Sequence, residues 1–313
     1  MKKQIITVTL NPALDKISQI EHVVPNQKLR CEKPRHEAGG GGINVSRAIR
    51  RLGGDSLALF PCGGSNGEII KNMLADENVR FKATPIQDLT RENLTLFESS
   101  TDNQYRFIMP GHHLSQEEWE QTLKEISEHQ PQPDFIVLSG STPPGVPTNY
   151  YQRIANLARD LNSKLIVDTS GDSLVAAANA GVYLLKPNMR ELRILAQGEI
   201  ESEAQQKQAA RGLIKSGKAK IVIVSLGAGG ALLVTKNITE HIRTPTVPIR
   251  SKLGAGDSMV AGVVLSLAQG KRILDAIKFG VAAGAAGVMT PGTELCRKED
   301  TDKLYQRLMD QPS

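Results

Sequence analysis

The chain has 313 residues, of which 40% are hydrophobic and 23% charged, and its formal net charge is +5. This length suits one large α/β domain, with or without a small appendage, and the composition is that of an ordinary globular protein. The mild positive excess favours anionic substrates such as phosphates. Aromatic residues are only 4%, and the lysines and arginines are scattered rather than gathered into a stripe, so nucleic acid is not expected as a partner.

The ends and the cysteines carry no signal for export, membrane insertion or metal binding. The apolar stretch after Met1-Lys2-Lys3 is short, is interrupted by threonines and runs into Asn11-Pro12 without a cleavage site, so it indicates a first β-strand. No run approaches the length of a membrane span. The three cysteines are far apart and form no C-x-x-C pair, which argues against a zinc site or a disulfide framework. A cytoplasmic location is expected.

Short β-branched runs alternate along the chain with longer amphipathic or alanine-rich stretches. Such alternation predicts a parallel sheet flanked by helices, because parallel strands need crossover connections. The expected strands are residues 4–10, 56–61, 135–139, 164–168, 182–185 and 220–225. The expected helices are 43–52, 65–77, 116–128, 148–161, 188–196 and 203–216.

Other segments depart from this alternation. Residues 15–36 and 90–109 alternate apolar and polar side chains, which predicts half-buried antiparallel strands in a small sheet standing off the main domain. Residues 221–225 and 231–235, with glycines between them, indicate a hairpin. Two helices are expected to end the chain. The first follows Asp257, and the second carries small residues from Gly280 to Gly287 that permit close approach of a helix or of a flat ligand.

The run Gly254-Ala255-Gly256-Asp257 stands just before a helix. Glycines let successive backbone N–H groups converge on an anion at the helix N-terminus. A carboxylate there would repel a phosphate unless it accepted a proton from an attacking hydroxyl. Asp257 is therefore a candidate general base, although Asp is also a common N-cap.

A second glycine run, Gly39 to Gly42, enters a helix that carries Asn44 in its first turn. Four consecutive glycines are entropically costly, and a backbone that passes close to a ligand would justify them. The alternative is an ordinary helix start.

Asn188 and Glu191 lie three residues apart after an expected strand, and Asp168 ends another. Amide and carboxylate groups of this kind suit magnesium held largely through waters. Equally, Asn188 and Glu191 could form a capping box.

The strand-end loops at 139–145 and 225–230 are further ligand positions, because ligands in open α/β sheets bind where strands end. The usual P-loop and dinucleotide fingerprints are absent, and His112-His113 is assigned to a loop.

In this order, the motifs resemble those of the ribokinase-like (PfkB) family of carbohydrate kinases. The similarity spans nearly the whole chain: Thr7–Asp15, Lys28–Cys31, the tetraglycine run, Thr90–Asn93, Tyr105–Gly111, Lys186–Asn188 and Gly254–Met259. The resemblance implies one Rossmann-like, three-layer α/β kinase domain over 1–313 with a small β-sheet lid at about 15–36 and 90–109. It also implies a homodimer formed through the lid, with no membrane partner.

The resemblance assigns roles to individual residues. Asp257 would act as the base, with the amides of Gly254, Ala255 and Gly256 stabilising the transferred phosphoryl. The sugar and its phosphate would be held by Asp15, Lys28, Gly40, Gly41, Gly42, Asn44, Arg91 and Ser141. ATP would contact Lys186, Asn188, Arg190, Ser225, Gly227, Gly229, Gly230, Val281 and Ala285. Mg²⁺ would be organised by Asp168 and Glu191, and K⁺ by Ser251, Leu253, Gly287, Thr290 and Gly292.

Within the family the resemblance is to enzymes that phosphorylate fructose 6-phosphate. Gly41 and Tyr105–Gly111 match them, whereas Asn11-Pro12 is common in relatives that use tagatose 6-phosphate or fructose 1-phosphate, so these substrates stay open. A non-catalytic sugar-phosphate sensor is a further alternative. Val24 replaces an aromatic residue of the fructose 6-phosphate type, which predicts altered inhibition by MgATP where that inhibition occurs.

Overall fold

A computed structural model describes residues 3–292 and 294–310. Its main sheet has the strand order β13-β12-β11-β10-β9-β8-β1-β4-β5, and all neighbours pair in parallel except β11–β12 and β12–β13. The strands are β1 (Ile5–Val8), β4 (Leu57–Cys62), β5 (Arg80–Pro85), β8 (Phe135–Ser139), β9 (Lys164–Asp168), β10 (Val182–Leu185), β11 (Ala219–Ser225), β12 (Ala231–Thr235) and β13 (Thr239–Ile242).

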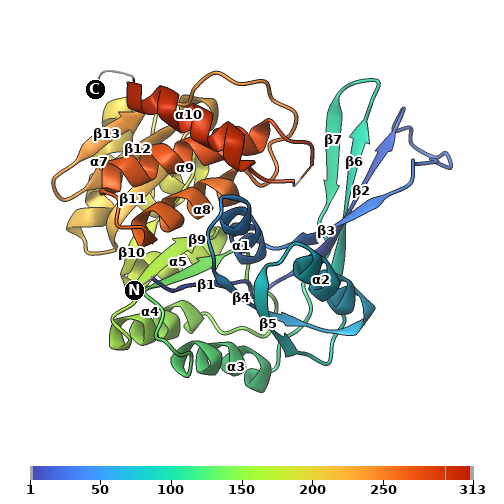
Figure 1. Cartoon of the computed structure of the whole chain (residues 1–313), viewed down its shortest axis with the longest axis horizontal. Helices are drawn as coiled ribbons and strands as arrows, with labels where there is room; N and C mark the ends of the chain where they lie inside the picture. Colours follow the sequence, from blue (N-terminus) through green and yellow to red (C-terminus); the bar gives the residue numbers. More distant parts are fainter. Residues whose placement is uncertain (1–2, 293, 311–313) are drawn as a thin grey trace.

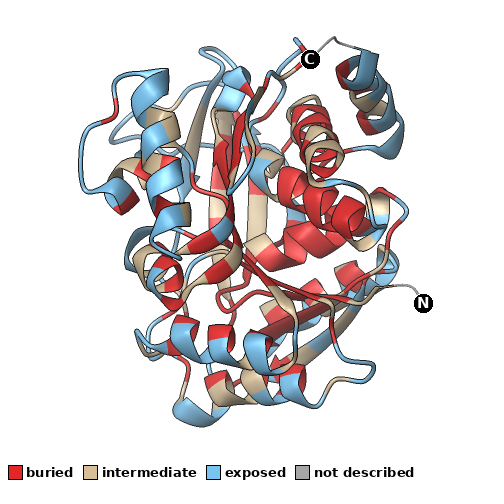
Figure 2. Ribbon diagram, turned by 90° about the vertical axis from the view of Figure 1, so that its left-hand side faces the viewer, coloured by how far each residue is buried: buried red, intermediate tan, exposed pale blue. Residues whose placement is uncertain are grey.

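Helices cover both faces of this sheet (Figure 1), and the buried residues gather along the sheet and the helix faces turned toward it (Figure 2). The helices are α1 (Gly41–Arg51), α2 (Gly64–Asp76), α3 (Gln116–Ser127), α4 (Tyr150–Asp160), α5 (Gly171–Ala180), α6 (Met189–Ala196), α7 (Glu203–Lys215), α8 (Ala255–Ala268), α9 (Ile273–Val288) and α10 (Lys298–Asp310). The predicted parallel sheet with flanking helices is confirmed. No helix in the described ranges is long and apolar enough to cross a membrane.

The strand β11 shows why its sequence is apolar without alternation. Ile221 and Ile223 pack into the core cluster that contains α8 and α9, while Val222 and Val224 pack into the cluster that contains α4 and α5. Both faces of the sheet are buried along residues 221–224, so these four positions are all apolar.

Four elements differ from the sequence-based expectation. The helices α5 and α10 and the strands β5 and β13 were not predicted, and from Asp257 to residue 310 the described residues form three helices rather than two. The strand β5 carries charged residues at alternating positions because it lies at an edge of the sheet. The helix α10 is rich in charge because it buries only Thr301, Leu304 and Leu308.

A second sheet stands away from the main body (Figure 1) and has the order β3-β2-β6-β7. Its strands are β2 (Ala13–Ile20), β3 (Arg35–Gly39), β6 (Arg91–Glu98) and β7 (Asn103–Phe107). The expectation of antiparallel pairing is correct for β2–β3 and β6–β7 but wrong for β2–β6, which run parallel from Ala13↔Arg91 to Ile20↔Glu98. Alternating polarity indicates a half-buried strand without fixing the direction of its partner.

Candidate active site

Asp257 lies in the first turn of α8. The helix is entered through Gly254, whose positive φ of 70° is a conformation that side chains other than glycine adopt only with strain. The Asp257 carboxylate is partly buried and accepts a hydrogen bond of 3.0 Å from Nδ2 of Asn44. Burial, and next the charge of Asp168, raise the pKa of Asp257 to about 7, against the opposing effects of Asn44 and Lys186. A carboxylate with this pKa suits general base catalysis near neutral pH.

Asn44 is itself held in place by the next turn of α1. Its Oδ1 accepts a hydrogen bond of 3.4 Å from Arg47, whose side chain also donates to the carbonyl of Ala38 at 3.0 Å. Arg47 is 3% exposed and forms a two-pronged ion pair with Glu77, at 2.9 and 2.6 Å. The side chain of Asn44 thus has its oxygen directed at Arg47 and its nitrogen at Asp257.

Lys186 lies beside the glycine-rich turn Gly254–Gly256 at the start of α8. It follows β10, is 7% exposed, and pairs with Asp168 at the end of β9 at 3.0 Å. Burial is the largest single effect and disfavours its ammonium, but the charge and hydrogen bond of Asp168, with the charges of Glu191 and Asp257, together outweigh it and raise the pKa of Lys186. A Cβ placed on Gly256 would lie 3.7 Å from the Lys186 Nζ, so the ammonium adjoins the start of α8. An anion above this turn would meet both a fixed cation and the helix N-terminus.

The two carboxylates expected to organise magnesium already have partners in the protein. Asp168 pairs with Lys186, and Glu191 accepts from the backbone nitrogen of Asn188 at 2.8 Å while Asn188 accepts from that of Glu191 at 2.9 Å. The capping box expected as an alternative therefore forms. Between residues 3 and 310, apart from residue 293, no group of three or more His, Cys, Asp or Glu residues could hold a metal. Two oxygen ligands with waters still fit Mg²⁺, which keeps several waters in protein sites.

The expected sugar site lies where β2, β6 and the loop after β8 approach. Asp15 accepts a hydrogen bond of 2.8 Å from Asn93, and burial raises the pKa of Asp15. Arg91 donates to the carbonyls of Asn11 and Met109, each at 3.0 Å, and Ser141 accepts from Asn11 at 3.0 Å. These contacts fix the orientation of the Asp15, Arg91 and Ser141 side chains.

The glycine run is needed for packing within the chain. A Cβ on Gly39 would overlap the Asp15 carboxylate, and one on Gly40, whose φ is 120°, would overlap Thr9. On Gly42 it would lie 2.5 Å from the carbonyl oxygen of Val8, and on Gly41 it would lie 2.7 Å from the backbone nitrogen of Gly140. Close approach to a ligand is therefore not required to explain the four glycines.

Gly41→Ala is expected to lower the free energy of unfolding by about 1–3 kcal/mol, the usual cost of overpacking. The added methyl group would meet the backbone of Gly140, which cannot rotate away as a side chain could. Urea denaturation measures the loss. Gly198→Ala is the matched control, because no atom lies within 4 Å of its Cβ position. Equal midpoints for the two variants would contradict this account of the glycine run.

The positions expected to contact ATP are only partly gathered. Ser225 donates its backbone N–H to the carbonyl of Pro187 at 2.9 Å, which brings the turn through Gly227, Gly229 and Gly230 beside Asn188. Arg190 is exposed on α6. Val281 and Ala285 are 3% and 5% exposed and belong to the core. The small residues of α9 chiefly allow close packing on α8, as at Gly280 against Val263.

The residues expected around a monovalent cation come together in two neighbouring loops. Ser251 is buried and donates its N–H to the carbonyl of Val288 at 3.2 Å. Thr290 donates to the carbonyls of Gly287 and Leu295, at 2.8 and 3.0 Å. Leu253 lies beside Ser251, and the guanidinium of Arg35 lies against Gly292.

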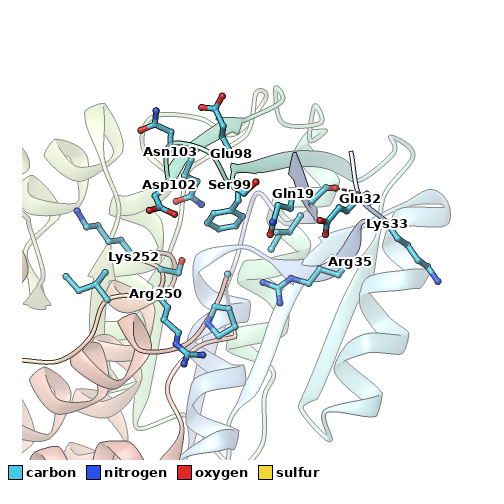
Figure 3. Close-up of a pocket in the computed structure, with 18 residues that line it drawn as sticks. Gln19, Glu32, Lys33, Arg35, Glu98, Ser99, Asp102, Asn103, Arg250 and Lys252 are labelled. Atoms are coloured by element: carbon cyan, nitrogen blue, oxygen red, sulfur yellow. Dashed lines mark hydrogen bonds between the residues drawn. The ribbon is translucent and has the colours of Figure 1, made fainter. Parts of the chain in front are cut away.

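A cavity of about 980 Å³ opens between these loops and the small sheet (Figure 3). Arg250 and Lys252 line it from the main domain, and Asp102, in the turn before β7, and Glu98, the last residue of β6, line it from the small sheet. No sequence pattern marks these four residues as functional, because charged residues in loops and at strand ends carry no periodicity. Lys28 was expected at the substrate phosphate, but it is exposed in the loop 21–34 at the outer end of the small sheet (Figure 1).

The three-layer fold and the cluster around Asp257 define the class as a phosphotransferase. A model of the pfkB family carbohydrate kinases matches residues 8–300, and the chain belongs to this family. It is 44% identical to the ATP-dependent 6-phosphofructokinase isozyme 2 of Mycobacterium tuberculosis over 97% of this chain and 90% of the relative. Identity is 42% to the Escherichia coli enzyme of the same name, over 97% and 99%.

The fold is also similar to a solved structure. The crystal structure of phosphofructokinase-2 from Escherichia coli in complex with potassium matches with a TM-score of 0.95 and 41% identity, covering 98% of this chain and 99% of that one. The expected Rossmann-like, ribokinase-type architecture and the family resemblance are thereby confirmed.

Proposed function

We propose that this chain is an ATP-dependent 6-phosphofructokinase, which transfers the γ-phosphoryl group of ATP to the C1 hydroxyl of fructose 6-phosphate and gives fructose 1,6-bisphosphate. The observation that carries the proposal is the position of Asp257, a carboxylate with a raised pKa at the glycine-rich start of α8. Relatives at 42–44% identity bear this name. A cytoplasmic location is part of the proposal.

In the proposed reaction, an oxygen of Asp257 accepts the C1 hydroxyl proton as the hydroxyl oxygen bonds to the γ-phosphorus and the bond to ADP breaks. The backbone amides of Gly254, Ala255 and Gly256 stabilise the charge on the transferring group. Lys186 adds a fixed positive charge beside them. Mg²⁺, held through waters by Asp168 and Glu191, would neutralise ATP phosphate charge.

The other proposed roles follow the geometry of the two sheets. Asp15, Asn44 and the backbone of Gly40–Gly42 hold the sugar hydroxyls, while Arg91 and Ser141 hold the 6-phosphate. Asn188, Arg190 and the turn Ser225–Gly230 contact ATP, with Val281 and Ala285 beneath it. K⁺ binds in the loops that contain Ser251, Leu253, Gly287, Thr290 and Gly292. The crystal structure of the Escherichia coli relative with potassium supports this last role.

The small sheet is proposed to act as a lid and to join two copies of the chain. Val24 and Leu29, in the loop 21–34, and Phe107, at the end of β7, are 38%, 39% and 46% exposed, and exposed apolar side chains on one appendage favour an interface. Lys28 has no partner among residues 3–292 and 294–310. For Lys28 to reach a substrate phosphate, the loop must move or serve a second copy docked on the sheet.

A coupled kinase assay on fructose 6-phosphate, tagatose 6-phosphate and fructose 1-phosphate, with and without K⁺, tests the proposed function. We expect the highest kcat/KM on fructose 6-phosphate and faster turnover with K⁺. A higher kcat/KM on either other sugar would transfer the assignment to that substrate. Binding without turnover of all three would make the chain a sensor.

A further inference from the structure

A basic hollow lies at the amino ends of the parallel strands of the main sheet, whereas the candidate active site lies at their carboxyl ends. Its volume is about 370 Å³ and its lining includes Lys3, Arg159, Lys164 and Lys220. Lys164 begins β9 and Asp168 ends it, so the hollow and the active site are separated by roughly 13 Å of strand at about 3.3 Å per residue. The hollow is therefore a separate feature of the molecule.

The four cations come from four separate parts of the chain: Lys3 lies two residues before β1, Arg159 lies in α4, and Lys164 and Lys220 lie at the starts of β9 and β11. In the part of the chain that the structure describes, none of the four forms an ion pair. One acidic residue, Asp134, lines the hollow, and its carboxylate accepts a hydrogen bond of 2.8 Å from the backbone nitrogen of Gln4. Scattered in the sequence, these charges are gathered by the fold.

The cations are close enough to repel one another. The ammonium of Lys3 lies 5.8 Å from the ring centroid of Phe135, and that of Lys164 lies 5.3 Å from the same centroid and 5.1 Å from that of Tyr183. Burial and then the charge of Lys3 lower the pKa of Lys164; the charge of Asp134 opposes this, and that of Lys220 adds to it. Ring faces compensate an ammonium only weakly, and a single carboxylate, that of Asp134, faces four cations, so the hollow keeps a net positive charge.

We propose that this hollow binds a small phosphate-bearing anion with at least two negative charges, such as pyrophosphate or the phosphate chain of a nucleotide. Such a ligand would sit among several ammonium and guanidinium groups, which are good phosphate donors. Asn162, Ser163 and Tyr183 add neutral donors to the lining. Because Lys164 already covers a face of Tyr183, the hollow recognises phosphate rather than a stacked base.

Lysine acylation of the intact protein, read by peptide mass spectrometry, tests the proposal residue by residue with pyrophosphate as the probe. At about ten times Kd, occupancy predicts that labelling of Lys164 and Lys220 slows about ten-fold. Lys303, which is exposed on α10, and Lys207, which pairs with Glu203 at 2.7 Å, are the internal controls. Lys186 is buried against Asp168 and is a poor acylation target, so pyrophosphate binding at the active site is followed separately, by inhibition of the sugar kinase activity.

The expected result is protection of Lys164 and Lys220 without protection of the two control lysines. Unchanged labelling of Lys164 and Lys220 at millimolar pyrophosphate would overturn the proposal. Equal slowing at all lysines, reproduced by sodium chloride of the same ionic strength, would also overturn it, because it would show charge screening alone. In calorimetry, Lys220→Met should weaken pyrophosphate binding at this hollow, whereas Lys303→Met should not. The sugar kinase activity of both variants should equal that of the unmodified protein.

Discussion

Asp257→Asn is expected to lower kcat by about 10²–10⁴-fold, the usual contribution of one general base. Asn keeps the size of the side chain and can still accept from Asn44, but it cannot take up the proton of the attacking hydroxyl. KM for the sugar phosphate should change little, because Asp15, Arg91 and the glycine run remain. Turnover and sugar binding, measured on the same preparation of Asp257→Asn, test whether Asp257 is the base. Near-normal turnover would exclude it.

The same carboxylate should set the pH dependence of the reaction. Asp257 accepts a proton only when it is ionised, and its pKa in the free protein is about 7. The value of kcat/KM, which reports the free enzyme, should therefore rise with pH through about 7 and then level off. The residual activity of Asp257→Asn should lack this rise. A wild-type profile already level from pH 5 upward would contradict the assigned pKa.

Raising the pKa of a carboxylate also costs stability. The folded protein binds a proton at Asp257 more tightly than the unfolded chain, whose Asp titrates near 3.8. The stabilising contribution is complete below about pH 4 and is lost as pH rises through about 7. Asp257→Asn should accordingly raise the Tm at pH 8 relative to the unmodified protein, and the gain should shrink toward pH 4. A stability gain of this kind at a catalytic position reflects a trade of stability for activity.

Much of the fold could be read from local patterns, because burial on both sheet faces leaves a direct record in the sequence. Ile221–Val224 is apolar without alternation since its side chains enter both core clusters. The parallel pairing of β2 with β6 left no such record, because Ala13 and Arg91 are brought together by the fold alone. Likewise α5, in which four of ten residues are alanine, lacks a clear polar face that would mark it as a helix.

In the candidate active site too, the positions of the residues could be predicted from the sequence, but their contacts could not. Strand-end and helix-start positions mark Asp168, Lys186 and Asp257 as candidates, because ligands of α/β sheets collect at these ends. Which partner each side chain meets is a different matter. Asn44 and Asp257 are 213 residues apart, and no local pattern reports their hydrogen bond. Nor does the sequence show that the glycine run is required by contacts with Asp15, Thr9 and Gly140.

Arg47→Met is expected to shift the apparent pKa of kcat/KM upward by about one unit, although Arg47 does not touch Asp257. Arg47 holds the oxygen of Asn44, which leaves the amide nitrogen directed at the Asp257 carboxylate at 3.0 Å. Without Arg47 the amide can turn, and the carboxylate then loses a donor that lowers its pKa. A hydrogen bond to a charged group contributes about 1.5–3 kcal/mol, and one pKa unit corresponds to about 1.4 kcal/mol.

At pH 7 this shift should lower kcat/KM several-fold, with recovery near pH 9, where the carboxylate is ionised again. Asn44→Leu should move the midpoint in the same direction and also raise KM, because Asn44 is proposed to hold the sugar.

Glu77→Gln is the matched control, since it disrupts the ion pair with Arg47 while leaving the contact between Arg47 and Asn44. Both Arg47→Met and Glu77→Gln should destabilise the fold, because each leaves one partner of a buried pair uncompensated. Only Arg47→Met should move the pH midpoint. An unchanged pH midpoint in Arg47→Met would show that Arg47 has a purely structural role. A shift of the midpoint that Arg47→Met shares with Asn44→Leu, and that Glu77→Gln lacks, would establish that Arg47 positions the base through Asn44.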